Sequence, residues 1–208
     1  FWPPYQRLAA WLREGRIGAL RAARFRLHVP VEPWCQVTAH RLDPREGGVL
    51  ADLGSQLADL AHHTVGELAG TLRGSLRPDR ATIRLARADG VEVAFDVAYA
   101  PRAAETIALE GDEGALELRN PNFAIHHVKP GARPGLIGHL RDALAVAPRA
   151  LMRSRTMTRF TIGASLGAFL RRDAPPERVG YGEARAHVAF LERVQQALGP
   201  ARSMPGPA

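Results

Sequence analysis

The stretch from Gly47 to Gly66 constrains the fold more than any other, because it has the spacing of an amphipathic helix bounded by glycines. Its apolar stripe consists of four leucines three or four residues apart: Leu50, Leu53, Leu57 and Leu60. A polar stripe with the same spacing shares one helix face: Asp52, Gln56, Asp59 and His63. The sequence thus predicts a helix with one face in a core and another that either meets water or lines a polar site.

Strand patterns surround this helix. Between Val91 and Tyr99 apolar residues alternate with polar or small ones, as in a strand with one buried face, and the preceding Asp89-Gly90 pair is a strong hairpin signal. Further strands are predicted at residues 22–29, 67–76, 81–88, 105–110, 115–118 and 123–128. Because consecutive strands joined by tight turns pair antiparallel, we predict a meander with one covered face.

Helical patterns occupy both ends of the chain. One lies near the N-terminus and is ended by Gly15, and three others cover residues 136–152, 157–170 and 183–198. We find no internal repeat and no interior linker. We therefore predict one α+β domain over residues 1–202, an open, mainly antiparallel sheet with helices packed on one face, and a disordered tail at 203–208.

Charge and composition exclude several functional classes. The formal charge is +7, but Lys129 is the sole lysine and the arginines are scattered through every segment. The one cluster, at residues 149–159, indicates a solvated helical face or an interface with an acidic partner. No nucleic-acid-binding motif accompanies the charge, so we expect no nucleic-acid partner.

The sequence also has no signature of a membrane, secreted or metal-binding protein. No run approaches the roughly 18 apolar residues that span a bilayer, no secretory signal is recognisable, and the single cysteine, Cys35, cannot form an internal disulfide. We therefore expect a cytoplasmic location without membrane association. The pairs His62-His63 and His126-His127 are adjacent residues that point in different directions, so we predict no metal site. Neither Cys35 nor any serine has the context of a nucleophile.

The pattern GG-x-L-x-D-L-G-x-Q-x-x-D at residues 47–59, preceded by an arginine-bearing loop with Trp34, resembles the second domain of the Gfo/Idh/MocA oxidoreductases. The opening FWPPYQRLAAWLREGRIGALRAARFRLHVP is similar to the segment that begins that domain. The resemblance spans nearly the whole chain, in register to about Gly90 and generic beyond. It implies that the sheet face away from the helices serves subunit contact, hence a homodimer or homotetramer.

The resemblance also implies a cofactor, NAD or NADP, bound by a domain that is not present in this chain. No G-x-G-x-x-G follows a predicted strand, so we expect no Rossmann domain within these residues. In the family a separate N-terminal domain binds the dinucleotide and supplies the lysine of a Glu-Lys-Pro motif, in which Lys129 does not lie. NAD(P)-dependent dehydrogenase activity is therefore expected only when this chain is joined to such a domain.

For the site itself, the family pattern implies a carboxylate and a histidine four residues apart on the helix after the Gly-Gly turn. Asp52 occupies the carboxylate position, and Gln56 stands where histidine is usual, so these two are the candidate catalytic residues. An amide can orient a hydroxyl group but cannot shuttle a proton. Another explanation for Asp52 is stabilisation of the helix start by its negative charge.

Four further residues are candidates for substrate binding: Trp34, Arg41, Asp59 and His63. Trp34 could stack on a sugar ring or plug the sheet edge, and Arg41 could bind hydroxyls or a phosphate. Asp59 could instead cap a helix or make a buried polar contact. We predict a substrate-binding and oligomerisation domain of an NAD(P)-dependent oxidoreductase acting on a sugar-like or polyol substrate. The alternative is a non-catalytic binding or scaffold module that keeps the fold without the chemistry, which Gln56 and the missing cofactor domain both allow.

Overall fold

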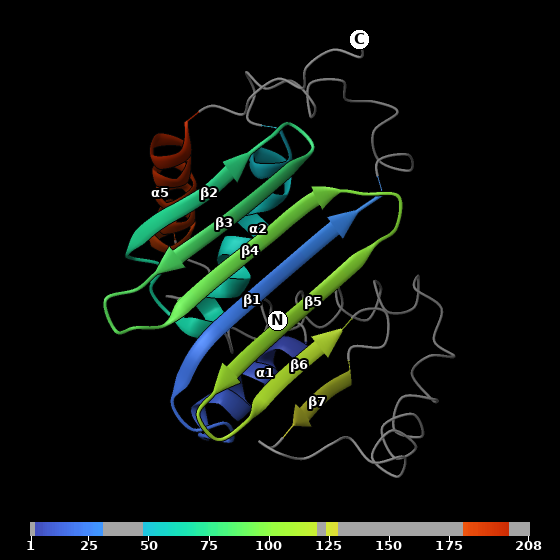
Figure 1. Cartoon of the computed structure of the whole chain (residues 1–208), viewed down its shortest axis with the longest axis vertical. Helices are drawn as coiled ribbons and strands as arrows, with labels where there is room; N and C mark the ends of the chain where they lie inside the picture. Colours follow the sequence, from blue (N-terminus) through green and yellow to red (C-terminus); the bar gives the residue numbers. More distant parts are fainter. Residues whose placement is uncertain (1–2, 31–47, 120–123, 129–180, 200–208) are drawn as a thin grey trace.

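The computed structural model describes residues 3–30, 48–119, 124–128 and 181–199, and the strands in this part form one seven-stranded sheet (Figure 1). In chain order they are β1 (Leu20–Val29), β2 (Thr71–Leu76), β3 (Arg80–Ala86), β4 (Glu92–Tyr99), β5 (Ala104–Gly111), β6 (Ala115–Arg119) and β7 (Ala124–Val128). The described helices are α1 (Pro3–Arg13), α2 (Gly48–Val65) and α5 (Tyr181–Leu198). Each lies where the sequence predicts it, with ends that differ by a few residues. The helices expected at 136–152 and 157–170, the arginine cluster at 149–159 and the tail at 203–208 lie outside the described residues.

The strand order is β2-β3-β4-β1-β5-β6-β7, which corrects the predicted meander. β4 and β5 are consecutive in sequence but do not pair, because β1 lies between them. β1 is parallel to β4 and antiparallel to β5, whereas the other neighbouring strands pair antiparallel, so the sheet is mixed but mainly antiparallel. The central place of β1 has a physical reason: a strand of ten residues at a sheet edge would leave a row of backbone groups without partners.

All three described helices lie on one face of the sheet, as predicted (Figure 1). α2 crosses the middle of the sheet and contacts β1, β3 and β4, while α1 contacts β6 and β7 and α5 contacts β2. Three phenylalanines join these layers: the rings of Phe25 and Phe95 stack at 5.6 Å on neighbouring strands, and Phe190 of α5 lies 5.6 Å from Phe95. In the described part of the chain, no helix has the length and apolarity needed to cross a membrane.

The predicted amphipathicity of α2 is confirmed. Leu50, Leu53 and Leu57 are buried against the sheet and Leu60 is partly buried, whereas Gln56 is exposed. Burial of these side chains accounts for most of the stability of such a helix, since each fully buried leucine contributes roughly 2 kcal/mol.

The first residue of α2 is fixed against the turn between β2 and β3. Gly48 has a φ of +57°, and the next residue, Val49, donates its backbone N–H to the carbonyl of Pro78 at 2.8 Å. A Cβ atom at position 48 would lie 2.5 Å from that carbonyl oxygen. Glycine is therefore required here both for its backbone conformation and for the close approach.

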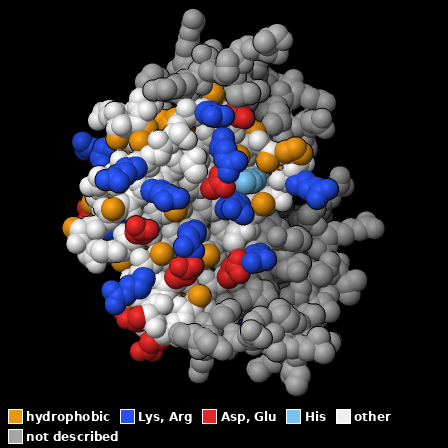
Figure 2. Space-filling model, in the orientation of Figure 1, with side chains coloured by type: hydrophobic (Ala, Val, Ile, Leu, Met, Phe, Trp, Pro, Cys, Tyr) orange, Lys and Arg blue, Asp and Glu red, His pale blue; other side chains and the backbone are white. Residues whose placement is uncertain are grey.

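The face away from the helices is charged (Figure 2). Asp96 of β4 accepts hydrogen bonds from Arg26 of β1 at 3.2 Å and from Arg80 of β3 at 2.8 Å, and Arg24 pairs with Glu110 of β5. Small side chains alternate with these groups on the same face: Ala22, Ala94 and Ala108. This open face combines ion pairs with short alanines and has few large apolar side chains.

Candidate functional site

The candidate site lies where β1 and β4 end. They form the one parallel pair among the described strands, so their carboxyl ends meet at the same edge, with Val29 beside Tyr99. The N–H of Ala100 donates to the carbonyl of Val29 at 3.0 Å, and the N–H of Tyr99 donates to the carbonyl of Asp79 at 2.8 Å. Because Asp79 follows Pro78 in the turn that holds the start of α2, the helix begins at this same edge. Carboxyl ends of parallel strands are a common place for ligand sites.

Asp52 is held at this edge by a tyrosine. The hydroxyl of Tyr99 donates a hydrogen bond to Oδ2 of Asp52 at 2.8 Å, and both residues are half-buried. Tyr99 reaches the helix because it continues the buried alternation of Val93, Phe95 and Val97 along β4. A hydrogen bond to an ionised carboxylate is stronger than one between neutral groups.

The explanation of Asp52 as a residue that stabilises the helix start does not fit this geometry. α2 begins at Gly48 and has no acidic residue in its first turn. Asp52 lies in the second turn, and its carboxylate bonds to a side chain of the sheet. The effect of the helix dipole on a charge is concentrated in the terminal turn, so it does not account for this position.

The rest of the polar stripe extends away from Asp52. Gln56 lies one turn further along α2 and is exposed, and Asp59 and His63 are exposed as well. At 1.5 Å per residue, Asp59 is about 10 Å and His63 about 16 Å from Asp52 along the helix axis. Only Asp52 and Gln56 are therefore close enough to contact the same small group.

Asp59 is directed toward α5. Its Oδ1 lies 3.7 Å from Nε2 of His187, and its side chain is 67% exposed. Of the alternatives weighed for Asp59, a buried polar contact does not fit this exposure. Trp34 and Arg41, the two candidates in the loop before α2, lie outside the described residues.

Tyr99 is the residue of this cluster that the sequence interpretation missed. Its signal was the end of the alternating strand, where the buried face changes from Val97 to an aromatic residue with a polar tip. Buried tyrosines usually find a hydrogen-bond partner for the hydroxyl. That rule predicts a polar partner near the end of β4 but does not identify Asp52, which is 47 residues away in sequence.

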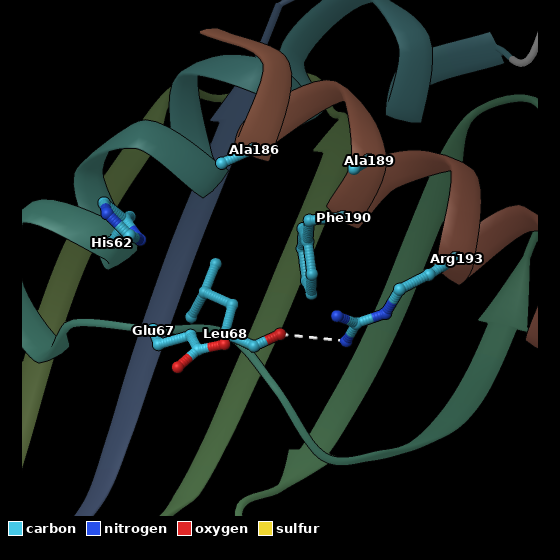
Figure 3. Close-up of a pocket in the computed structure, with 7 residues that line it drawn as sticks. All are labelled: His62, Glu67, Leu68, Ala186, Ala189, Phe190 and Arg193. Atoms are coloured by element: carbon cyan, nitrogen blue, oxygen red, sulfur yellow. Dashed lines mark hydrogen bonds between the residues drawn. The ribbon is translucent and has the colours of Figure 1, made fainter. Parts of the chain in front are cut away.

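A small cavity of about 210 Å³ lies at the opposite end of α2, against α5 (Figure 3). Arg193 closes one side and donates from Nη2 to the carbonyl of Leu68 at 2.9 Å. The lining residues are His62, Glu67, Leu68, Ala186, Ala189, Phe190 and Arg193. The cavity is smaller than the roughly 300 Å³ at which small-molecule sites begin, and neither Asp52 nor Gln56 lines it. We therefore do not assign it to the candidate site.

Two described groups have a clearly shifted pKa, and both lie in exposed ion pairs. A hydrogen bond from Arg87, together with one from the N–H of Val91, lowers the pKa of Asp89 in the hairpin before β4. A hydrogen bond to Glu117 raises the pKa of Arg119 on β6. Asp89 precedes β4 and Tyr99 ends it, so this titrating pair lies at the other end of the strand from Asp52. Within the described ranges, no group of three or more His, Cys, Asp or Glu side chains could hold a metal ion.

Comparison with known families identifies the class of protein. Residues 5–117, more than half of the 208 residues, match the model of the GFO/IDH/MocA C-terminal domain. The chain therefore belongs to the Gfo/Idh/MocA oxidoreductase family, as its helix motif indicated. No curated protein matches the sequence.

Solved structures share the fold at low sequence identity. One is KijD10, a 3-ketoreductase from Actinomadura kijaniata in complex with TDP-benzene and NADP. It is 17% identical in sequence, with a TM-score of 0.60, and the match covers 99% of this chain and 60% of the KijD10 chain. An oxidoreductase from Sinorhizobium meliloti is 17% identical with a TM-score of 0.61, over 94% of this chain and 59% of its own. An oxidoreductase from Agrobacterium radiobacter in complex with NAD+, L-tartaric acid and magnesium is 19% identical with a TM-score of 0.56, over 93% of this chain and 59% of its own. The chain thus spans about three-fifths of the length of each of these proteins.

Proposed function

We propose that this chain is the substrate-binding and oligomerisation domain of an NAD(P)-dependent oxidoreductase that acts on a sugar-like or polyol substrate. The observation that carries the proposal is the Asp52 carboxylate, held at 2.8 Å by Tyr99 where the parallel strands β1 and β4 end. Membership of the Gfo/Idh/MocA family supports the redox class.

The proposed chemistry assigns a separate task to each candidate side chain. Oxidation of a secondary alcohol removes a proton from the hydroxyl group and a hydride from its carbon, leaving a ketone. Asp52, which is half-buried, would accept the proton as general base. Gln56, one turn away, would bind a neighbouring hydroxyl through its amide.

The hydride acceptor would be NAD or NADP. We propose that it is bound by a domain outside these 208 residues, since the sequence contains no G-x-G-x-x-G after a strand. The NADP and NAD+ bound to the KijD10 and Agrobacterium proteins support this cofactor class. The lysine that the family uses would likewise come from that domain.

The substrate class is proposed from the residue types and from the neighbouring structures. A carboxylate and an amide on one helix face suit hydroxyl groups, and the TDP compound and L-tartaric acid bound to the relatives are small polar molecules. Trp34 and Arg41 keep their proposed roles in stacking on and binding the substrate. Asp59 and His63 would contact only a substrate that extends about 10 Å or more along α2.

We further propose that a second copy of the chain covers the open face of the sheet, giving a homodimer or homotetramer. The helices already cover the other face (Figure 1), and the alanines between the ion pairs allow a flat surface to approach closely. Several of the charged groups are paired within the chain, as at Asp96, which lowers the cost of burying them between two such faces.

One observation favours the alternative of a non-catalytic module. Gln56 stands at the position of the usual histidine, and its amide cannot exchange protons. Such a module would still bind a sugar-like molecule at Asp52 but would not turn it over.

The test is Asp52→Asn in the longest native polypeptide that carries this segment, with turnover of sugars and polyols followed by nicotinamide absorbance. Loss of a general base should lower kcat/KM by about 100-fold or more. The matched control is Asp89→Asn at the far end of β4, because Asn-Gly keeps the hairpin turn. Wild-type turnover in Asp52→Asn would refute the assignment. Sugar binding without any turnover by the unmutated protein would favour the non-catalytic module.

A further inference from the structure

We infer that Tyr99 is a positioning residue for Asp52: its hydroxyl fixes the carboxylate in the orientation needed to accept the substrate proton. The inference rests on the proposed function of Asp52. Its starting point is the 2.8 Å hydrogen bond from the Tyr99 hydroxyl to Oδ2, which joins the central strand β4 to the second turn of α2.

Tyr99 can act as a rigid reference because its own position is set by the sheet. Its backbone N–H donates to Asp79 at 2.8 Å, and the next N–H along the chain donates to Val29 at 3.0 Å. Its ring packs partly buried against the hydrophobic core. A tyrosine has two rotatable side-chain torsions, so a fixed backbone and a packed ring leave little freedom for the hydroxyl.

Asp52 needs such a reference because a carboxylate on a helix can rotate about its own side-chain bonds. A hydrogen bond to Oδ2 restrains rotation of the carboxylate about the side-chain bonds and so favours one direction for the other oxygen. Gln56 cannot do this, because it is exposed on the same helix and moves with Asp52. The sheet, through Tyr99, provides a contact that is independent of the helix.

A contrasting explanation treats the hydroxyl as structural only. Tyr99 would then satisfy its polar tip at the end of a buried stripe and stabilise the packing of α2 on β4. Both explanations predict some destabilisation when the hydroxyl is removed. They differ in the kinetics, because a residue that acts through Asp52 has no effect on catalysis once the Asp52 carboxylate is gone.

The experiment is a double-mutant cycle on turnover with Tyr99→Phe, Asp52→Asn and the double variant, made in the same native polypeptide. Tyr99→Phe should lower kcat/KM by about 10-fold, mostly in kcat, because a hydrogen bond to a charged group is lost while the ring remains. In the Asp52→Asn background the same change should have almost no further effect. Tyr5→Phe in α1, which also removes a hydroxyl from a ring packed against the core, is the control and should leave kcat/KM unchanged.

Each outcome separates this inference from the proposed function. If Asp52→Asn loses activity but Tyr99→Phe does not, or if the two losses multiply in the double variant, the positioning role is wrong and the assignment of Asp52 stands. If Asp52→Asn keeps full activity, the assignment of Asp52 fails and the role of Tyr99 fails with it. Circular dichroism and thermal unfolding of every variant show whether each is folded at the assay temperature. If Tyr99→Phe is unfolded there, the cycle is measured at a lower temperature with the same criteria.

Discussion

Replacing Gly48 by alanine tests how the start of α2 is fixed, and the structure allows the cost to be divided. Any L-residue at a φ of +57° pays a backbone penalty of about 1 kcal/mol. The new Cβ would also lie 2.5 Å from the carbonyl oxygen and 2.8 Å from Cα of Pro78, and both are backbone atoms that cannot rotate away. Relief of this clash separates α2 from the turn and breaks the 2.8 Å bond from Val49, which costs about 1 kcal/mol more, and lost packing adds a similar amount. We expect a total of about 3 kcal/mol.

Gly66 at the other end of α2 provides the matched control. It also has a positive φ, +82°, but a Cβ there would have no heavy atom within 4 Å. Gly66→Ala should therefore cost only the backbone penalty of about 1 kcal/mol. Urea unfolding followed by circular dichroism measures both values. Equal destabilisation by the two substitutions would refute the conclusion that contact with Pro78 fixes the helix start.

Two further predictions concern surface charges. Because Arg87 holds the pKa of Asp89 below its ordinary value of 3.8, the ionised carboxylate stabilises the fold at neutral pH, and this contribution is lost as the pH falls through the lowered pKa. The difference in urea midpoint between wild type and Asp89→Asn should accordingly shrink in acid; a constant difference would contradict the pairing. Ala94→Glu places a bulky, negatively charged side chain on the open face between Arg24 and Arg84, whose positive charges make it tolerable in a monomer. If that face joins two copies of the chain, the substitution should reduce the molecular mass measured by light scattering. The control is Val188→Glu on α5, because Val188 is already 53% exposed, and this substitution should leave the mass unchanged.

Local patterns predicted the elements of this fold well. The buried face of an element determines where its apolar residues fall, so the spacing of nearby residues indicates its type, as in the alternation from Val91 to Tyr99 and the leucine stripe of α2. The order of the strands in the sheet is not indicated by any local pattern of residues. The side chains of β1 would alternate in the same way beside β2 or β6, so its insertion between β4 and β5 could not be read from its own residues.

The candidate site was predictable to the same extent. The helix motif predicted Asp52 and Gln56 as catalytic residues, which stays a prediction, and family membership is confirmed. The spread of the polar stripe was partly predictable, because the rise of a helix separates Asp59 from Asp52 whatever the fold. The Tyr99 partner was not, because it depends on the placement of α2 across the end of β4, a tertiary contact between segments that are far apart in sequence.

The central position of β1 has a consequence during synthesis on the ribosome. Ala22 pairs with Glu92, 70 positions later, and with Glu110, so β1 emerges long before either neighbour exists. At 5–20 residues per second, the strand waits for about 4 s or more with both edges open. Alternating arginines, Arg24 and Arg26, flank the buried Phe25 in that waiting strand. Charges at such positions oppose strand-to-strand association, so the arginines of the open face protect the nascent chain before they pair with Glu110 and Asp96.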